Sequence, residues 1–246
     1  MENAAIHSRP PVALITGAAQ RLGKAMTEHL ARRGWSVAVH YNTSGGPAED
    51  LVSRLAMEFP EQHFTAFRAN LTNDRETEGL LTEVIRKMGK PELLINNASV
   101  FDPKKISDTG NAFFDFQMTV NLKAPFILTR EYIRHCGQGM IVNMTDTRIT
   151  SNRENYAAYT LAKKSLWELT KMTAAAYGPA LRANAIAPGL TLAPAGKGEE
   201  YLRTLAAAIP MKRPGGIQPI LDALDYLLKN DYLTGELLFC DGGQHL

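Results

Sequence analysis

Short runs of apolar, often β-branched residues alternate along the chain with longer segments in which apolar residues recur at helical spacing. Runs this apolar are typical of strands whose two faces are both covered by helices. The regular alternation of the two patterns predicts βαβ units around a parallel sheet. The expected strands are 12–16, 36–41, 63–68, 93–96, 140–143, 182–187 and 237–240.

Six helices are expected between these strands, which predicts one α/β domain over residues 11–246 with a doubly wound, seven-stranded parallel sheet. Residues 1–10 are polar and are expected to form a disordered tail. The segment 189–199 is rich in Gly, Pro and Ala and follows an expected strand, where ligands of open α/β sheets bind. It is therefore expected to begin a substrate loop or lid, and Glu199 with Glu200 is expected to start a solvated helix. The six helices are expected at about 21–33, 47–58, 74–88, 111–135, 156–177 and 217–229.

Composition narrows the classes of partner. The chain has 246 residues, 45% of them hydrophobic, which is enough for one large core. Its 27 basic and 25 acidic residues are spread without a basic run, so no nucleic-acid partner is expected. Cys136 and Cys240 show no paired spacing, which predicts neither a disulfide framework nor a metal site and favours a reducing, cytoplasmic setting. No segment approaches the about 18 continuous apolar residues of a membrane span, so a soluble protein without a membrane partner is expected.

The first expected strand is followed by the run Thr-Gly-Ala-Ala-Gln-Arg-Leu-Gly at residues 16–23, which opens the first expected helix. This is the context of a dinucleotide-phosphate turn. Gly17 permits a tight turn, Gly23 permits close helix packing, and the helix N-terminus faces a pyrophosphate. Leu22, beside Gly23, is expected to join the cofactor contacts.

Two further features favour NADPH over NADH. Arg21 places a cation near the adenosine ribose. The second expected strand ends in Tyr41-Asn42-Thr43-Ser44, where an NAD enzyme would hold the ribose with a carboxylate. Because no carboxylate is there to repel a 2′-phosphate, the polar side chains can donate hydrogen bonds to its oxygens while Arg21 supplies the charge. The alternative is that Arg21 is a solvated residue at the start of the helix.

The candidate catalytic residues lie in the second half of the chain. Tyr159 and Lys163 are four residues apart in the expected helix 156–177, so the phenol and the ammonium share one face. A nearby cation favours phenolate and is expected to draw the pKa of Tyr159 below its reference of about 10, making it a better proton donor near neutral pH. Asn121, in the long helix expected at 111–135, and Asp146, just past the fifth strand, complete the set.

From residue 12 to residue 243 the chain resembles a short-chain dehydrogenase/reductase. The matching motifs are the turn at 16–23, Asn96-Asn97-Ala98, Asn121, Tyr159 with Lys163, Asn184-Ala185-Ile186-Ala187-Pro188-Gly189, and Asp241-Gly242-Gly243.

The resemblance implies a Rossmann fold in which Tyr159 is the general acid and Lys163 binds the nicotinamide ribose. Asn121 would hold a water in the proton relay. The C-terminal tail would pack across a subunit interface, which favours a homotetramer. The further cofactor contacts that the resemblance implies are Asn70, Leu71, Asn97, Ala98, Ser99, Pro188 and Gly189.

A narrower resemblance is to pteridine reductases and bacterial dihydromonapterin reductases. It rests on Arg21, on His40-Tyr41-x-x-Ser44, on the run at 97–101, on Asp146 and on Tyr156. In those enzymes the pterin lies between the nicotinamide and a phenylalanine, a role that falls on Phe101; the alternative is a core aromatic beneath the loop. The substrate contacts implied are Ser99, Phe101, Asp146, Tyr156, Tyr159 and Leu190.

Asp146 lies thirteen residues before Tyr159, where Tyr-x-x-x-Lys reductases usually keep a serine or threonine hydroxyl. An acid beside the catalytic phenol suggests that a proton is delivered to a ring nitrogen. With its unperturbed pKa near 3.9 Asp146 would be ionised at pH 7, and could orient Tyr159 or accept from the pterin amino group. Burial could raise the pKa, so that the acid shares a proton with Tyr159. A third alternative is that Asp146 caps a loop while a plain carbonyl is reduced.

The chain is therefore predicted to be an NADPH-dependent reductase that converts a dihydropterin to a tetrahydropterin, with a proton from Tyr159 and Asp146. The enzymatic rival is a carbonyl or 3-oxoacyl reductase of the same fold. A non-enzymatic rival is an NADPH-sensing binding protein, and the intact set of Tyr159, Lys163 and Asn121 argues against it. The preferred pterin side chain and the acceptance of folates stay open.

Overall fold

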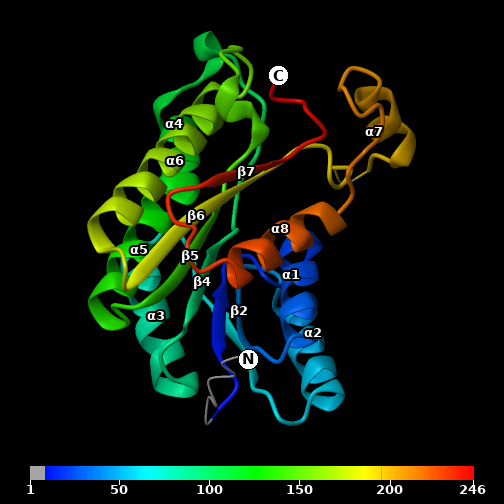
Figure 1. The fold of residues 1–246 in the computed structure, drawn as a ribbon. Coiled ribbons are helices and arrows are strands. Elements are labelled where there is room, and N and C mark those ends of the chain that lie inside the picture. Colours follow the sequence, from blue (N-terminus) through cyan, green and yellow to red (C-terminus); the bar gives the residue numbers. More distant parts are fainter. Residues whose placement is uncertain (1–8, 195) are drawn as a thin grey trace.

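The structure is a computed structural model, and it describes residues 9–194 and 196–246. Seven parallel strands form one sheet in the order β3-β2-β1-β4-β5-β6-β7, with helices on both faces (Figure 1). The predicted doubly wound sheet is confirmed, and each expected strand boundary lies within one residue of the observed one. The strands are β1 Val12–Ile15, β2 Ser36–Tyr41, β3 Phe64–Arg68, β4 Leu93–Asn96, β5 Gly139–Met144, β6 Leu181–Pro188 and β7 Leu237–Cys240.

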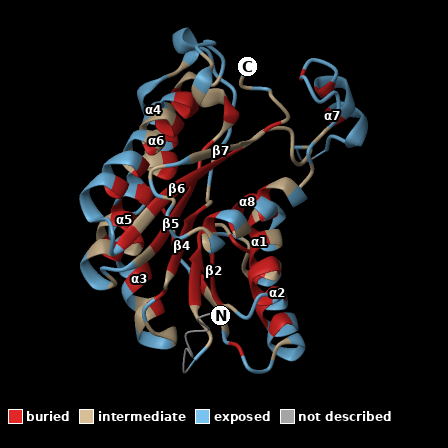
Figure 2. Cartoon of the chain, viewed as in Figure 1, coloured by how far each residue is buried: buried red, intermediate tan, exposed pale blue. Residues whose placement is uncertain are grey.

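Helices cover the sheet in two layers, each with its own part of the core. Successive strand residues point to opposite faces, so Ile15 joins one buried cluster and Leu14 the other. The central strands are buried along their whole length (Figure 2), which accounts for their unbroken apolar runs. The first layer is α1 Arg21–Ala31, α2 Gly45–Glu58 and α8 Gln218–Lys229; the second is α3 Asp74–Met88, α5 Ala124–His135 and α6 Ala157–Tyr177.

The prediction of one continuous helix over 111–135 is wrong. The segment divides into α4 Asn111–Met118, a π-helical turn Thr119–Lys123 (η2) and α5. Pro125 has no N–H to donate to the carbonyl of Asn121 four residues earlier, and its ring crowds that carbonyl, so the preceding turn widens. The interruption falls on Asn121, one of the candidate catalytic residues.

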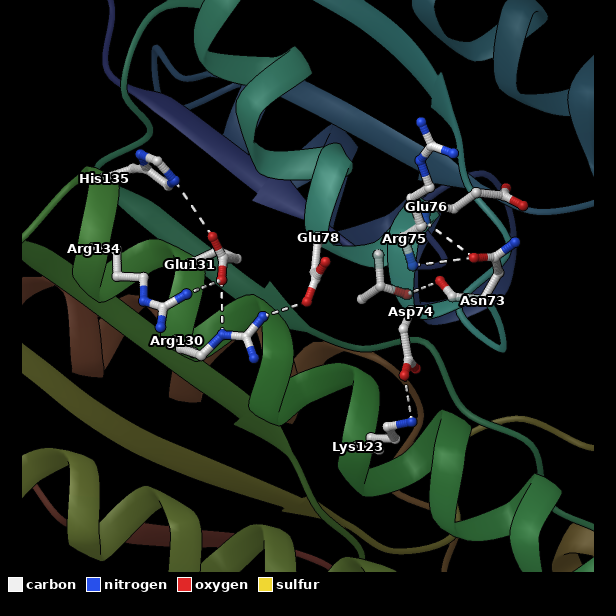
Figure 3. A network of polar contacts seen from close by, with 11 residues as sticks. Asn73, Asp74, Arg75, Glu76, Glu78, Lys123, Arg130, Glu131, Arg134 and His135 are labelled. Atoms are coloured by element: carbon white, nitrogen blue, oxygen red, sulfur yellow. Dashed lines mark hydrogen bonds and ion pairs between the residues drawn. The ribbon is translucent and has the colours of Figure 1, made fainter.

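A network of charges joins the second-layer helices at this point (Figure 3). Lys123, at the end of η2, pairs with Asp74 in the first turn of α3 at 2.6 Å. Further along, Arg130 of α5 reaches Glu78 of α3 and its neighbour Glu131, both at 2.7 Å. These contacts tie α5 and η2 to α3, and so help to fix the turn that carries Asn121.

The remaining elements lie around the carboxyl ends of the strands. They are η1 Ile106–Asp108, η3 Thr147–Thr150 and α7 Glu199–Ala206, the last beginning at the acidic pair expected to start a helix. Residues 1–8 of the expected tail lie outside the described residues. Arg9 is held by Glu92, with 3.0 Å between the guanidinium and the carboxylate. No described helix combines the length and the apolar character needed to cross a membrane.

Candidate active site

A cleft of about 340 Å³ opens beyond the carboxyl ends of β1, β2 and β4, where the order of the strands reverses direction. Crevices at this position bind ligands in doubly wound sheets. The residues around it come from three segments that the sequence had marked separately. They are Gly17, Ala19, Gln20, Arg21, Leu22, Gly23, Tyr41, Asn42, Thr43, Ser44, Asn97, Ala98 and Ser99.

The glycine turn is closely packed against the end of β4. Gly17 has φ +61°, and a Cβ there would lie 3.1 Å from the Cα of Ala98. A Cβ on Gly23 would lie 2.1 Å from the Gly17 carbonyl oxygen, so no side chain fits at this position. The Thr16 hydroxyl accepts hydrogen bonds from the N–H groups of Asn97 and Ala98, each at 2.9 Å. The turn and the strand end thus form one rigid wall of the cleft.

This cleft fits a dinucleotide phosphate. The residue preceding α1, Gln20, makes no side-chain cap, so the first N–H groups of the helix are not satisfied by a capping oxygen. Unpaired N–H groups at a helix N-terminus attract anions, and the close packing at Gly17 and Gly23 holds the turn beside this helix end. The residues present therefore suit the pyrophosphate that the sequence predicted.

His40 holds the glycine turn by a hydrogen bond from the backbone of that turn, a role that the sequence did not predict. Its Nδ1 accepts from the N–H of Gly17 at 3.0 Å, so its Nε2 carries the proton donated to the Ala69 carbonyl at 3.0 Å. The ring is therefore neutral. Burial lowers the pKa of His40 to about 4. The position of His40 at the end of β2, one residue before Tyr41, was the feature of the sequence that could have indicated this role.

Arg21 lines both this cleft and the neighbouring substrate cavity. Its guanidinium donates to the carbonyl of Ala193 at 2.9 Å and to that of Leu192 at 3.5 Å, so it holds the segment after β6. The 2′-phosphate contact predicted for Arg21 stays a prediction. Asn70 and Leu71 do not line the cleft, and their cofactor contacts likewise stay predictions.

The centre of the site is a hydrogen bond between the two candidate proton donors. The Tyr159 hydroxyl lies 2.7 Å from Oδ2 of Asp146, and the other oxygen of Asp146 accepts from the N–H of Arg148 at 2.7 Å. Tyr159 comes from α6 and is 5% exposed, whereas Asp146 immediately precedes η3. The structure therefore brings together two side chains that the sequence placed thirteen residues apart.

Burial governs the ionisation of this pair. It raises the pKa of Asp146, against the opposing effect of its hydrogen bonds from Arg148 and Tyr159. It also raises the pKa of Tyr159, and the Asp146 carboxylate raises it further. The predicted lowering of the Tyr159 pKa is therefore wrong: desolvation and the neighbouring acid outweigh the lowering effects, which come from Arg148 and Ser99.

Lys163 lies deeper in the site, 2% exposed. Its ammonium donates to the carbonyl of Met144 at 2.7 Å and lies 5.7 Å from the centre of the Tyr159 ring. Burial lowers the pKa of Lys163 to about 8. An ammonium has three N–H donors, and the described residues supply one acceptor, so two donors are available to a ligand. This arrangement suits the ribose hydroxyls of a nicotinamide nucleotide.

Asn121 uses its side chain to hold the loop that follows β4. Its Oδ1 accepts from the Ser99 hydroxyl at 2.7 Å, and its Nδ2 donates to the Val100 carbonyl at 3.0 Å. Gln117, one turn earlier, accepts a further bond from Nδ2 at 3.1 Å. The amide is thus committed to positioning Ser99 and Val100, and its expected part in holding a relay water stays a prediction.

A chain of buried amides fixes α6 against the sheet. Asn96 on β4 donates to Asn143 on β5 at 2.8 Å, and Asn143 donates to the hydroxyl of Thr170 on α6, also at 2.8 Å. Asn143 and Thr170 were not singled out in the sequence, although an asparagine in an otherwise apolar strand was a usable signal. The chain sets the position of the helix that carries Tyr159 and Lys163.

The substrate cavity lies beside Asp146, under the loop that follows β6. Phe101 and Tyr156 stack with ring centres 4.3 Å apart, and Phe101 meets Tyr159 edge-on at 4.7 Å. Phe101 is 44% exposed, so the alternative of a buried core aromatic is not met. Tyr156 has φ +65°, a conformation unusual for a bulky residue, and its N–H is held by the Lys104 carbonyl at 3.0 Å.

The cavity is lined both by residues that the sequence singled out and by others that it did not: Leu190, expected as a substrate contact, lies here. Pro188 and Gly189 also lie here, on the substrate side. Polar and apolar residues from η3, α7 and the C-terminal segment join them, because the fold brings these distant segments to one end of the sheet. Thr191, Leu192 and Pro194 belong to the segment expected to begin a substrate loop, whereas the lining residues not expected from the sequence are Thr147, Arg148, Tyr201, Leu202, Leu205 and Gln244. Among the described residues no group of three or more His, Cys, Asp or Glu side chains could hold a metal ion.

The fold, the phosphate turn and the Tyr-Lys pair define the class of nicotinamide-dependent oxidoreductases. A family profile described as "Enoyl-(Acyl carrier protein) reductase" matches residues 17–245. The chain belongs to this family of short-chain dehydrogenases/reductases, whose members use nicotinamide cofactors. The predictions of family and of a nicotinamide cofactor are thereby confirmed.

Individual relatives differ in what their names say. The chain is similar in structure to FolM alternative dihydrofolate reductase 1 from Brucella canis, solved with NADP, with TM-score 0.89 and 33% identity over 96% of this chain and 94% of that one. It is 29% identical to glucose 1-dehydrogenase of Gluconobacter oxydans, over 94% of this chain and 90% of the relative. It is 28% identical to pteridine reductase 1 of Leishmania tarentolae, over 96% of each.

Proposed function

We propose that the protein is an NADPH-dependent pteridine reductase that converts a dihydropterin to a tetrahydropterin. The observation that carries the proposal is the hydrogen bond of 2.7 Å between Tyr159 and the buried carboxyl of Asp146, at the inner end of a cavity with an exposed Phe101 ring. Reduction of a ring C=N bond needs a proton at nitrogen, and a coupled phenol and acid can supply it. The similarity to pteridine reductase 1 and to the FolM structures supports this reading.

Each residue has a distinct part in the proposed reaction. When bound, NADPH supplies the hydride. Tyr159 donates a proton to the ring nitrogen, and Asp146 returns a proton to Tyr159. Because burial raises the pKa of Asp146, its protonated form extends towards neutral pH, where this transfer is useful. Lys163 orients the cofactor ribose with its two available donors.

Phe101 offers the heterocycle an aromatic face. Tyr156 stacks on this ring, Tyr159 makes a T-shaped contact with it, and Arg148 lies 5.3 Å from its centre, so the proposal places a flat substrate against the part of the ring that these neighbours leave exposed. Such stacking is worth about 0.5–1.5 kcal/mol beyond burial. Cofactor selectivity is proposed to come from Asn42, Thr43 and Ser44, since none of the described residues that line that end of the cleft is acidic.

The rival function is reduction of a plain carbonyl, and the similarity to glucose 1-dehydrogenase favours it. The two are separated by NADPH oxidation with 7,8-dihydrobiopterin and with a panel of ketones, using wild-type protein, Asp146→Ser and Asp146→Asn. Dihydropterin turnover that collapses in both variants is expected. The exposed Asp231→Ser is the matched control and should keep wild-type rates.

Turnover of ketones alone, undiminished in Asp146→Ser, would sink the pterin proposal. NADPH binding with no oxidation over the whole panel would instead support the binding-protein rival. The proposal also includes a homotetramer and a cytoplasmic location, which light scattering and cell fractionation test.

A further inference from the structure

Arg148 is a cation in the substrate cavity with unused hydrogen-bonding capacity. It sits on η3, two residues after Asp146, and its guanidinium carbon lies 4.5 Å from the centre of the Tyr156 ring and 5.3 Å from that of Phe101. Within the described residues its guanidinium makes no hydrogen bond and no ion pair. Cation–π contacts with the two rings stabilise the guanidinium without using its N–H donors, which leaves those donors for a ligand.

The other cation of the cavity is already engaged. Arg21 donates to the carbonyls of Leu192 and Ala193, so its guanidinium holds the loop. Among the described residues Asp146 is the one acid that lines the cavity, and its two oxygens accept from Tyr159 and from the backbone N–H of Arg148. Among the described residues the half-buried Arg148 therefore forms no ion pair, although its charge acts on the Asp146 carboxyl and opposes the rise of the Asp146 pKa that burial causes.

The wall of the cavity that α7 forms, away from Tyr159 and Asp146, suits a substrate with a long, partly apolar tail. Tyr201, Leu202 and Leu205 of α7 line the cavity, and Tyr201 and Leu205 are each 39% exposed. Lys197 adds a second cation at the rim, 5.8 Å from the centre of the Tyr201 ring. An aromatic tail ending in a carboxylate would cover the apolar wall and meet positive charge. A short hydroxylated tail would leave both unused.

We propose that Arg148 is a specificity residue that binds a carboxylate on the substrate tail, so that the protein prefers pteridines with a carboxylated aromatic tail over those with a neutral hydroxylated one. This inference rests on the proposed function and adds the class of substrate to it. A guanidinium pairs with a carboxylate through two parallel N–H···O bonds, and a rigid aromatic support keeps that fork in one orientation.

The test compares KM and kcat for 7,8-dihydrofolate, whose tail is carboxylated, with those for 7,8-dihydrobiopterin, whose tail is neutral. Arg148→Gln should raise KM for dihydrofolate by about tenfold to a hundredfold, the usual effect of losing a charge-assisted hydrogen bond, and change KM for dihydrobiopterin less than about threefold. Arg148→Lys should restore part of the loss, because it keeps the charge without the fork. KM of the wild-type protein for dihydrofolate should also rise with salt.

Arg153→Gln is the matched control, since Arg153 is an exposed arginine five residues away that does not line the cavity. Equal changes in KM for both substrates, or a fall in kcat for both with a shifted pH profile, would mean that Arg148 acts through Asp146 and would overturn the inference while leaving the proposed function standing. Wild-type reduction of dihydrobiopterin alone would overturn it too. Failure to reduce either substrate would overturn the proposed function as well. Urea unfolding of each variant shows whether it is folded.

Discussion

The two ends of the active-site cleft are built in different ways. At the nucleotide end, polar atoms around the glycine turn are paired with neutral neighbours: Thr16 with the backbone of the β4 end, and a neutral His40 with Gly17. At the substrate end, Tyr159, Asp146 and Lys163 lie together, and burial moves the pKa of each. The nucleotide end is therefore a rigid binding site for a charged ligand, whereas the substrate end is a set of interacting acids and bases.

This difference fits the roles proposed for the two ends, phosphate binding at one and proton transfer at the other. A phosphate is already charged, so the protein needs only fixed donors and space, and neutral hydrogen bonds provide them without depending on pH. Proton transfer needs groups whose ionised and neutral forms are close in free energy, and burial brings them there. Arg21 lines both cavities, so it is where the two ends are coupled.

The largest effect is expected at the substrate end. Tyr159→Phe removes the proposed proton donor and should lower kcat by about 10²–10⁴-fold, with the affinity for NADPH nearly unchanged because Lys163, the residue proposed to hold the ribose, keeps its place on the Met144 carbonyl. Stopped-flow oxidation and fluorescence titration measure the two quantities. Tyr177→Phe, at the exposed end of the same helix, is the control. An equal loss of NADPH affinity would show that the two ends are not separable.

At the nucleotide end, His40 is expected to link stability to pH. Its pKa is lowered from 6.5 to about 4 in the folded protein, so the unfolded chain binds the proton more readily. The contribution of the neutral His40 ring to the free energy of unfolding is complete above pH 6.5. It is lost as the pH falls from 6.5 to about 4, a loss of about 3 kcal/mol in total. Urea unfolding over this range should show a smaller pH dependence for His40→Gln, whereas the exposed His63→Gln should behave as wild type. Identical slopes would mean that the buried ring is not neutral.

Ser44→Asp tests whether the nucleotide end selects the phosphate. A carboxylate beside Asn42 and Thr43 should weaken NADPH binding by about tenfold to a hundredfold, because like charges are costly in a binding site, and should leave NADH binding nearly unchanged. Isothermal titration with both nucleotides measures this. Ser44 immediately precedes α2, and Ser53→Asp, on the exposed side of that helix, is the matched control. Equal weakening of NADH would place the 2′-phosphate elsewhere.

The smallest effect on binding is expected for Arg21, which lines both the nucleotide cleft and the substrate cavity. Arg21→Met should raise both the dihydropterin KM and the NADPH Kd by about tenfold, because it removes the bonds to Leu192 and Ala193 as well as a charge in the nucleotide cleft. Arg32→Met, an exposed arginine just after the same helix, is the control. A rise in KM alone would assign Arg21 to the loop, and a rise in Kd alone would assign it to the phosphate.

Strands, most helices and the phosphate turn were predictable because they are local. Alternation of apolar runs and helical periods sets the strand–helix order, and strand boundaries were placed within one residue. The helix at 111–135 was misjudged because its interruption depends on how Pro125 and Asn121 share one turn, which periodicity does not show. The pKa of Tyr159 was predicted to fall but is raised. The four-residue spacing on the helix shows that a cation is near the phenol, but it does not show that the phenol is buried.

The sequence by itself determined the sheet, the glycine turn, and the identity of Asp146, Tyr159 and Lys163, since each is written in a short stretch of residues. Only the tertiary structure decided how those residues interact. It placed Asp146 2.7 Å from the Tyr159 hydroxyl, made His40 a neutral support for Gly17, and left the Arg148 guanidinium beside an aromatic pair with no ion pair among the described residues. Contact, burial and dielectric environment arise from segments far apart in the chain, and these quantities fix the pKa values and the available hydrogen-bond donors.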